Sequence, residues 1–231
     1  MTEPAIHRIA TLDLKVKPRP WPFAEERRGE IEAHFGGVRE ARPEIWNGRV
    51  LLGRNAVRAG SRLSAEYFET DFASFLAWRD WGFPDREVFN GFGMGALLSA
   101  DGAFVLGEMG SHTANAGRIY FPSGTPDPGD VRDGMLDIEG SVMREVEEET
   151  GLAPADYAMD AQWNCVVAEP LVALIRILRV DMPGEALRAR IEQHLASEQR
   201  PELRAIHLVR GQADISPAMP RFVTAFLKAQ L

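Results

Sequence analysis

Runs and spacings of apolar residues predict alternating strands and helices along this chain. Residues 49–52 and 62–67 are typical of two strands, and we expect a hairpin between them that turns around residues 53–55 and 57–60. Farther along, Phe72, Phe75 and Leu76 occupy positions i, i+3 and i+4, which is the core-facing stripe of a helix over residues 70–79. Thr70 or Asp71 is suited to cap that helix.

The second part of the chain repeats this alternation of elements. The pattern predicts a hairpin with an Asp101-Gly102 turn, and a loop rich in proline and glycine over residues 122–134. It predicts a helix from Asp137, the expected N-cap, to about Thr150, with Gly151 ending it. Ser216-Pro217 is expected to open the last helix. The remaining elements are predicted as strands over 94–98, 103–108, 118–121, 163–168, 171–180 and 203–210, and a helix over 185–196. Mixed strands with helices between them indicate an α/β or α+β protein.

The first 90 residues are rich in arginine, proline and aromatic residues. Within them, residues 18–22 read Pro-Arg-Pro-Trp-Pro, which we expect to form neither a helix nor a central strand, because proline fixes φ and removes a donor. We therefore expect an α+β extension over residues 1–90 and a second domain over residues 91–231.

Charge and cysteine content exclude several function classes. The net charge of −8 disfavours binding to duplex DNA or to an anionic membrane surface. Cys165 is the single cysteine, so a disulfide framework and a multi-cysteine zinc site are excluded, and a reducing cytoplasm fits. No apolar run approaches the roughly 20 residues of a membrane span, and the start shows no signal-peptide pattern. We expect a cytoplasmic protein.

The most informative segment is Arg144-Glu145-Val146-Glu147-Glu148-Glu149-Thr150-Gly151-Leu152. On a helix, Glu145, Glu148 and Glu149 share a face, while Val142 and Val146 point to the opposite side. An acidic helix solvated by water also produces such a run. Three converging carboxylates, however, repel one another unless cations neutralise them, and they suit Mg²⁺ or Mn²⁺.

This segment resembles the second half of the signature of the Nudix hydrolases, Arg-Glu-apolar-x-Glu-Glu-x-Gly-apolar, at every specified position. The resemblance implies an α/β/α sandwich with a mixed β-sheet over about residues 91–231. It implies a metal-dependent enzyme that hydrolyses the diphosphate of a nucleoside diphosphate linked to another group. The resemblance also assigns roles, with Glu148 taking part in catalysis, Arg144 orienting the glutamates through ion pairs, and the metal held by Glu145, Glu148, Glu149 and Gly124.

The first half of the signature departs from the family pattern. Counting back from Arg144 places Leu136 where the family has a glutamate, and Ser123 precedes Gly124 where the family has a glycine pair. We expect a displaced acid to serve instead, and Asp130, Asp137 and Glu139 are the nearby ones. The alternative is a Nudix module that binds nucleotides without turning them over.

The altered signature resembles the UDP-sugar hydrolysing branch of the family, through residues 93–98 and 121–128. That branch implies cleavage of UDP-glucose or UDP-galactose to UMP and sugar 1-phosphate. ADP-ribose, dinucleotides and coenzyme A derivatives are the alternative substrates. The family also implies a homodimer.

A catalytic base outside this motif is often a glutamate in this family. Glu169, Glu198 and Glu202 are the candidates, and residues 198–202 form the loop that enters the strand predicted at 203–210. Each of the three could instead be a surface acid, and Glu202 is slightly preferred. His207 on that strand is expected to be a surface or satisfied histidine rather than a ligand. The aromatic residues Trp46, Tyr67, Trp78 and Trp81 are expected to be core rather than a base-stacking platform. Four arginines are candidates for binding phosphate, and position alone does not choose among them: Arg54, Arg58, Arg62 and Arg118.

Overall fold

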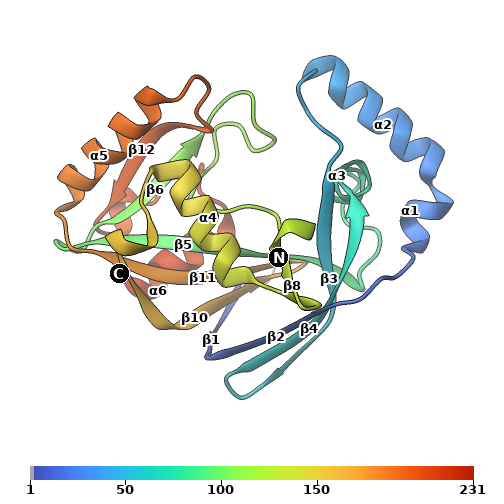
Figure 1. Ribbon diagram of the computed structural model, residues 1–231, viewed down its shortest axis with the longest axis horizontal. Helices are drawn as coiled ribbons and strands as arrows, with labels where there is room; N and C mark the ends of the chain where they lie inside the picture. The colour runs from blue at the N-terminus through green and yellow to red at the C-terminus, as the bar shows by residue number, and fades with distance from the viewer. Residues whose placement is uncertain (1–2) are drawn as a thin grey trace. The chain divides into compact units, whose positions relative to one another are not determined.

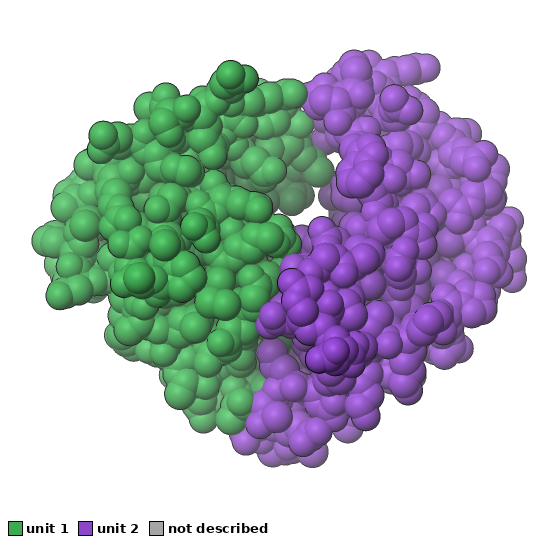
Figure 2. All heavy atoms as spheres, in the orientation of Figure 1, with its two compact units in different colours: residues 1–10, 92–124, 138–231 green, residues 11–91, 125–137 purple. Residues whose placement is uncertain are grey.

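A computed structural model describes residues 3–231, and the chain divides into two compact units (Figures 1 and 2). Unit 1 comprises the described residues up to Ala10, then Phe92–Gly124 and Ile138–Leu231. Unit 2 comprises Thr11–Gly91 and Thr125–Asp137. The domain ranges expected from the sequence, 1–90 and 91–231, stay a prediction. Neither unit is continuous in the sequence. The first strand belongs to unit 1 although it lies in the range 1–90, and residues 125–137 belong to unit 2 although they lie in the range 91–231.

Unit 1 is built on antiparallel strand pairs. β1 pairs with β10, β10 with β11, and β6 pairs with β5, β7 and β12. The strands are β1 (Ala5–Ile9), β5 (Val88–Ser99, from Phe92 onward), β6 (Phe104–Met109), β7 (Ile119–Tyr120), β10 (Ala158–Ala168), β11 (Leu171–Val180) and β12 (Leu203–Val209). The helices are α4 (Ile138–Thr150), α5 (Gly184–Ser197) and α6 (Arg221–Gln230).

Helices cover both faces of this sheet. Successive side chains of a strand point to opposite faces, and on β5 a Cβ at Gly95 would meet Val146 of α4, whereas Phe92 packs against Phe222 of α6 with ring centroids 5.5 Å apart. Figure 1 shows α4 in front of the strands of unit 1 and α6 behind them. The predicted α/β class with covering helices is therefore confirmed, and the parallel pairing of residues 11–16 with residues 62–67 makes the sheet mixed, as predicted.

Unit 2 has a smaller sheet and its own core. β2 (Thr11–Val16) runs parallel to β4 (Arg62–Asp71), while the other pairs of this sheet are antiparallel. The remaining elements are β3 (Arg49–Ala59), the first residues of β5, β8 (Val131–Arg132), β9 (Met135–Leu136), α1 (Pro22–Glu26), α2 (Arg28–Ala41) and α3 (Phe72–Asp80).

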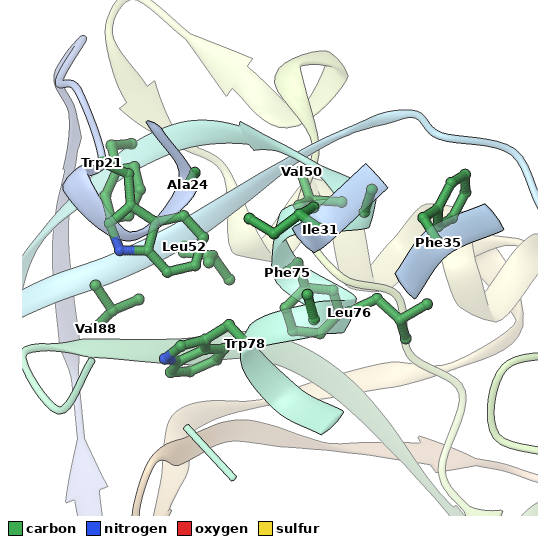
Figure 3. Packing of buried hydrophobic residues seen from close by; sticks show 13 residues of the cluster. Trp21, Ala24, Ile31, Phe35, Val50, Leu52, Phe75, Leu76, Trp78 and Val88 are labelled. Carbon is green, nitrogen blue, oxygen red and sulfur yellow. The ribbon is translucent and has the colours of Figure 1, made fainter. Parts of the chain in front are cut away.

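Buried aromatic and aliphatic side chains of the helices pack on β3 and β4 to form this core (Figure 3). Trp78 of α3 is fully buried, and its indole N–H donates to the backbone oxygen of Asp85 at 3.0 Å. The Asp85 carboxylate accepts the indole N–H of Trp21 at 2.9 Å. Both tryptophans thus satisfy their one polar group while burying their rings. Trp46 contradicts the expectation of a core residue, since it is 81% exposed.

Most predicted elements are present. Asp71 caps α3, as expected, by accepting the backbone N–H of Ser74 at 2.9 Å. The expected hairpin turn at residues 53–55 is wrong, because Gly53 lies within the ladder opposite Tyr67 and a bulge follows Arg54. The chain turns instead at Gly60, whose φ of +59° is the left-handed conformation that glycine tolerates best.

Two further expectations about prolines are wrong. Pro22 lies inside helix α1, where its missing N–H costs nothing because the first helical positions have no intrahelical acceptor. The last helix begins at Arg221, after Pro220, because Ser216 and Met219 close a turn instead. Among residues 3–231, no helix is both long and apolar enough to cross a membrane.

Candidate active site

The predicted glutamate helix is α4. Val142 and Val146 are buried against the sheet, as expected, and Glu148 is exposed. Gly151 ends the helix with a φ of +70°, and its N–H donates to the Glu147 oxygen at 2.9 Å. The hydrophobic stripe thus fixes which face of α4 points away from the core.

Three glutamates of α4 line one open pocket of roughly 510 Å³ within unit 1. Its other wall is the loop between α5 and β12. The lining residues are Glu145, Glu148, Glu149, Glu198, Gln199, Arg200 and Glu202. The predicted convergence of the three α4 carboxylates on one face is confirmed, and the loop adds two more acids.

Glu149 is the buried member of this set, with 5% of its surface exposed. Burial, together with the negative charge of Glu145, raises the pKa of its carboxyl well above the usual value. The backbone N–H of Ser123 donates to Glu149 Oε1 at 3.3 Å and opposes that rise. Glu149 Oε2 is buried and has no hydrogen-bond partner among the described residues. An unpaired buried oxygen is costly and is satisfied by a cation or a donor.

The loop after β7 approaches the glutamates closely. A Cβ at Gly124 would overlap the carboxylate of Glu145. The Pro122 oxygen accepts the N–H of Gly95 at 3.0 Å, which ties this loop to β5. Position 124 therefore requires a residue without a side chain as long as Glu145 keeps this position.

Arg144 lies beside the acidic face. Its Nη1 is 2.8 Å from Glu145 Oε1 and 3.5 Å from Glu148 Oε2. The orienting role that the family resemblance implies for Arg144 stays a prediction.

The acids expected to replace the glutamate that is missing at position 136 lie in different surroundings. Glu139 forms an ion pair with Arg176, so its carboxylate is already engaged. Asp130 belongs to unit 2, where it is buried and accepts the N–H of Asp127 at 3.1 Å. Leu136 is buried on β9. A displaced acid acting for the missing glutamate stays a prediction.

The three candidate bases separate by position. Glu198 and Glu202 line the acidic pocket, whereas Glu169 does not. Glu198 Oε1 is 3.4 Å from His194 Nε2. Glu202 is held through its backbone, because its oxygen accepts the N–H of Gly110 at 2.7 Å. His207 contacts Glu108 at 3.1 Å and is not part of the pocket lining.

One candidate functional residue, Tyr120, was not predicted from the sequence. Tyr120 of β7 is buried, and Asn115 Nδ2 donates to its hydroxyl oxygen at 3.1 Å. Burial and the negative charges of Glu149, Glu202 and Glu145 raise the pKa of this phenol. Its only signal in the sequence was its position before Phe121-Pro122-Ser123-Gly124, where an apolar strand pattern explained it equally well.

The residues predicted to hold metal fit a divalent cation chemically. Hard carboxylate oxygens suit Mg²⁺ and Mn²⁺, and the unpaired Glu149 Oε2 supplies a ligand that has no other partner among residues 3–231. As they stand, no three acidic, histidine or cysteine side chains in this described range are arranged to ligate one ion. The ligand set Glu145, Glu148, Glu149 and Gly124 therefore stays a prediction.

Comparisons with solved structures give Nudix hydrolases as neighbours. A Nudix hydrolase from M. smegmatis, RenU, is 12% identical, with 60% of this chain and 80% of that chain covered, and a TM-score of 0.39. A MutT protein from Methanosarcina mazei Go1 is 16% identical over 62% and 92% of the two chains, with a TM-score of 0.38. A C. elegans Ap4A hydrolase is 12% identical over 53% and 81%, with a TM-score of 0.37.

No family model matches the chain, and no curated protein matches it.

Proposed function

We propose that this protein is a divalent-cation-dependent hydrolase that cleaves the diphosphate of a nucleoside diphosphate linked to another group. The observation that carries the proposal is the acidic pocket of unit 1, where Glu145, Glu148 and Glu149 meet Glu202. So many carboxylates around a buried, unpaired Glu149 oxygen repel one another, and either a proton on Glu149 or a bound cation relieves that repulsion. The spacing of these residues is also that of the Nudix signature.

Glu145, Glu148 and Glu149, with a backbone oxygen at Gly124, would hold the cation, Mg²⁺ first and Mn²⁺ second. When bound, the cation supplies charge that offsets the charge of the diphosphate and polarises the attacking water. The absence of a side chain at Gly124 lets the loop lie against Glu145.

Two further residues orient the metal-binding glutamates and accept the proton of the attacking water. Arg144 holds Glu145 and Glu148 through its ion pairs, which reduces the repulsion between the two carboxylates. Glu202 accepts the proton of the attacking water, because it reaches the pocket from the loop opposite α4. Glu198 is the second choice, since His194 engages its carboxylate.

The first substrate to test is UDP-glucose or UDP-galactose, which water would cleave to UMP and sugar 1-phosphate. This choice rests on the resemblance of residues 93–98 and 121–128 to the UDP-sugar branch. ADP-ribose, dinucleotides and coenzyme A derivatives share the diphosphate and are the alternatives. A homodimer and a cytoplasmic location remain expectations from the sequence.

A second candidate is a module that binds nucleotides without hydrolysing them. Leu136 and Ser123, which depart from the family signature, favour it. Ser123 contacts Glu149 through its backbone N–H. That contact does not depend on the side chain at position 123, so the serine is compatible with an active enzyme.

The test is product formation with and without Mg²⁺ across UDP-glucose, ADP-ribose, NADH, coenzyme A and nucleoside triphosphates. Mg²⁺-dependent release of UMP from UDP-glucose supports the reaction and the branch. Cleavage of a different diphosphate keeps the reaction and replaces the substrate. Nucleotide binding without any product supports the inactive module and contradicts the enzyme.

A further inference from the structure

The four arginines that the sequence offers for phosphate binding have different surroundings. Arg62 of β4 is paired with Asp13 at 2.5 Å. Arg58 donates to the oxygen of Gly60 in its own hairpin turn at 3.3 Å. Of the three in unit 2, Arg54 lines an open pocket of that unit.

This pocket is open, has a volume of roughly 490 Å³ and belongs entirely to unit 2. The size falls in the range of small-molecule sites. Its charged lining consists of Lys17, Arg19, Arg54 and Glu66. Three cations therefore face one carboxylate, in a protein whose overall charge is −8. The lining shares no residue with the acidic pocket of unit 1.

The single carboxylate already has partners. Glu66 forms an ion pair with Lys17, and Asn55 Nδ2 donates to Glu66 Oε2 at 3.1 Å. The backbone of Lys17 is fixed as well, because its N–H donates to the oxygen of Tyr67 at 2.8 Å. Lys17 and Asn55 thus engage the one carboxylate of the lining by direct contacts, and Arg19 and Arg54 add two further positive charges to it.

Arg19 is exposed, and its charge helps to lower the pKa of the Glu66 carboxyl from a distance. No hydrogen bond or ion pair within 4 Å holds its side chain among residues 3–231. Pro18 and Pro20 flank it, and a proline restricts both its own φ and the conformation of the preceding residue. The segment is therefore stiff, which lowers the entropy lost when Arg19 binds a ligand.

Arg54 is only weakly engaged. Its side chain is 15% exposed, and its one ion pair, Nη2 to Glu87 Oε2 at 2.9 Å, is with a side chain that is 78% exposed. Ion pairs with such exposed partners contribute little. The Nε–H of Arg54 is buried and meets no acceptor within the described chain. A guanidinium in this situation gains by exchanging Glu87 for an anion with several acceptor oxygens.

We propose that Arg19 and Arg54, with Lys17 at the edge, form a binding site for the phosphoryl group of a small phosphorylated molecule. A phosphoryl group carries up to two charges and three strong acceptor oxygens, which matches two guanidinium groups better than a single carboxylate does. The site stands independently of the hydrolase proposed for unit 1.

Phosphate titrations followed by amide NMR shifts test the site, in EDTA and at low ionic strength. EDTA removes divalent cations, so the acidic pocket repels anions and does not contribute. The probes are inorganic phosphate, glycerol phosphate and UMP, which distinguish free phosphate from the phosphoryl group of an organic molecule. The variants are Arg19→Ala and Arg54→Ala. Arg58→Ala is the matched control, because it removes one exposed arginine of the same unit that is outside the pocket.

We expect saturable binding of at least one probe to the wild type, weakened about tenfold or more by Arg19→Ala and Arg54→Ala, which corresponds to about 1.4 kcal/mol each. Arg58→Ala and Glu149→Gln should bind like the wild type. Arg19 is exposed, so its variant tests the site even if Arg54→Ala does not fold. No saturable binding of any probe, equal weakening by Arg58→Ala, or loss of binding in Glu149→Gln would overturn the proposal.

Discussion

The α-carbon of Gly124 lies so close to the Glu145 carboxylate that a methyl group at position 124 would overlap it. The two residues come from a loop and a helix and are 21 positions apart in the sequence, so the contact brings the loop backbone against the acidic face of α4. A side chain at position 124 would therefore have to displace the Glu145 carboxylate.

Gly124→Ala should therefore lower Mg²⁺-dependent turnover by about 10- to 100-fold, because displacing a ligand by about 1 Å misplaces the reacting groups. The measurement is kcat against Mg²⁺ concentration. Gly37→Ala on α2 is the control, since its Cβ would meet nothing within 4 Å. Full activity in Gly124→Ala would show that the contact does not matter for function.

Arg144→Ala should reduce turnover by about 10- to 100-fold and raise the Mg²⁺ concentration needed for half-maximal activity. The reason is that Glu145 and Glu148 lose the guanidinium group that pairs with both of them. Arg188→Ala is a matched control. Arg188 also pairs with two glutamates of its own helix, Glu185 and Glu192, away from the pocket. If both variants lose the same activity, Arg144 has a structural role only.

Glu202→Gln should lower kcat by about 100-fold or more while leaving KM near the wild-type value, as expected for removal of a general base. Glu198→Gln, on the same loop and in the same pocket, should have a smaller effect. Glu169→Gln should have none. The kcat values at saturating substrate decide the assignment, and a larger loss in Glu198→Gln would reverse it.

Asp101 supplies a pH prediction that does not involve the acidic pocket. Hydrogen bonds from Ser99, the Gly184 N–H and Arg210 lower its pKa from 3.8 to about 2 in the folded protein. A lowered folded pKa stabilises the protein above the unfolded pKa, and this stabilisation is lost as the pH falls from about 4 through about 2. Urea midpoints measured across this range should fall less steeply for Asp101→Asn than for the wild type. Asp181→Asn, an exposed aspartate after β11, should leave the slope unchanged.

Local signals in the sequence predicted much of unit 1. Leu171–Val180 is a largely apolar strand in which only Arg176 and Arg179 are charged, and the Asp101-Gly102 turn and the Gly151 stop depend on local backbone preferences. The convergence of Glu145, Glu148 and Glu149 followed from helical geometry alone.

The features of unit 2 that the sequence did not predict depend on tertiary packing. Gly53 looked like a turn, yet it stays in the ladder because the Phe89 ring occupies the space where its side chain would lie. The parallel pairing of β2 with β4 joins residues about 50 positions apart, and no local pattern encodes it. The pocket around Arg54 was hidden for the same reason, since it brings residues 17–20 to residues 54 and 66–68.

The most direct test of the central claim is the rate of diphosphate cleavage as a function of Mg²⁺ concentration for wild type, Glu149→Gln and Glu147→Gln. Glu149 is buried with an unpaired oxygen in the pocket, whereas Glu147, on the same helix, is exposed and outside it. We predict Mg²⁺-dependent turnover in the wild type, a loss of at least about 100-fold in Glu149→Gln, and near wild-type turnover in Glu147→Gln. Turnover that needs no divalent cation, or that survives in Glu149→Gln, would contradict the account.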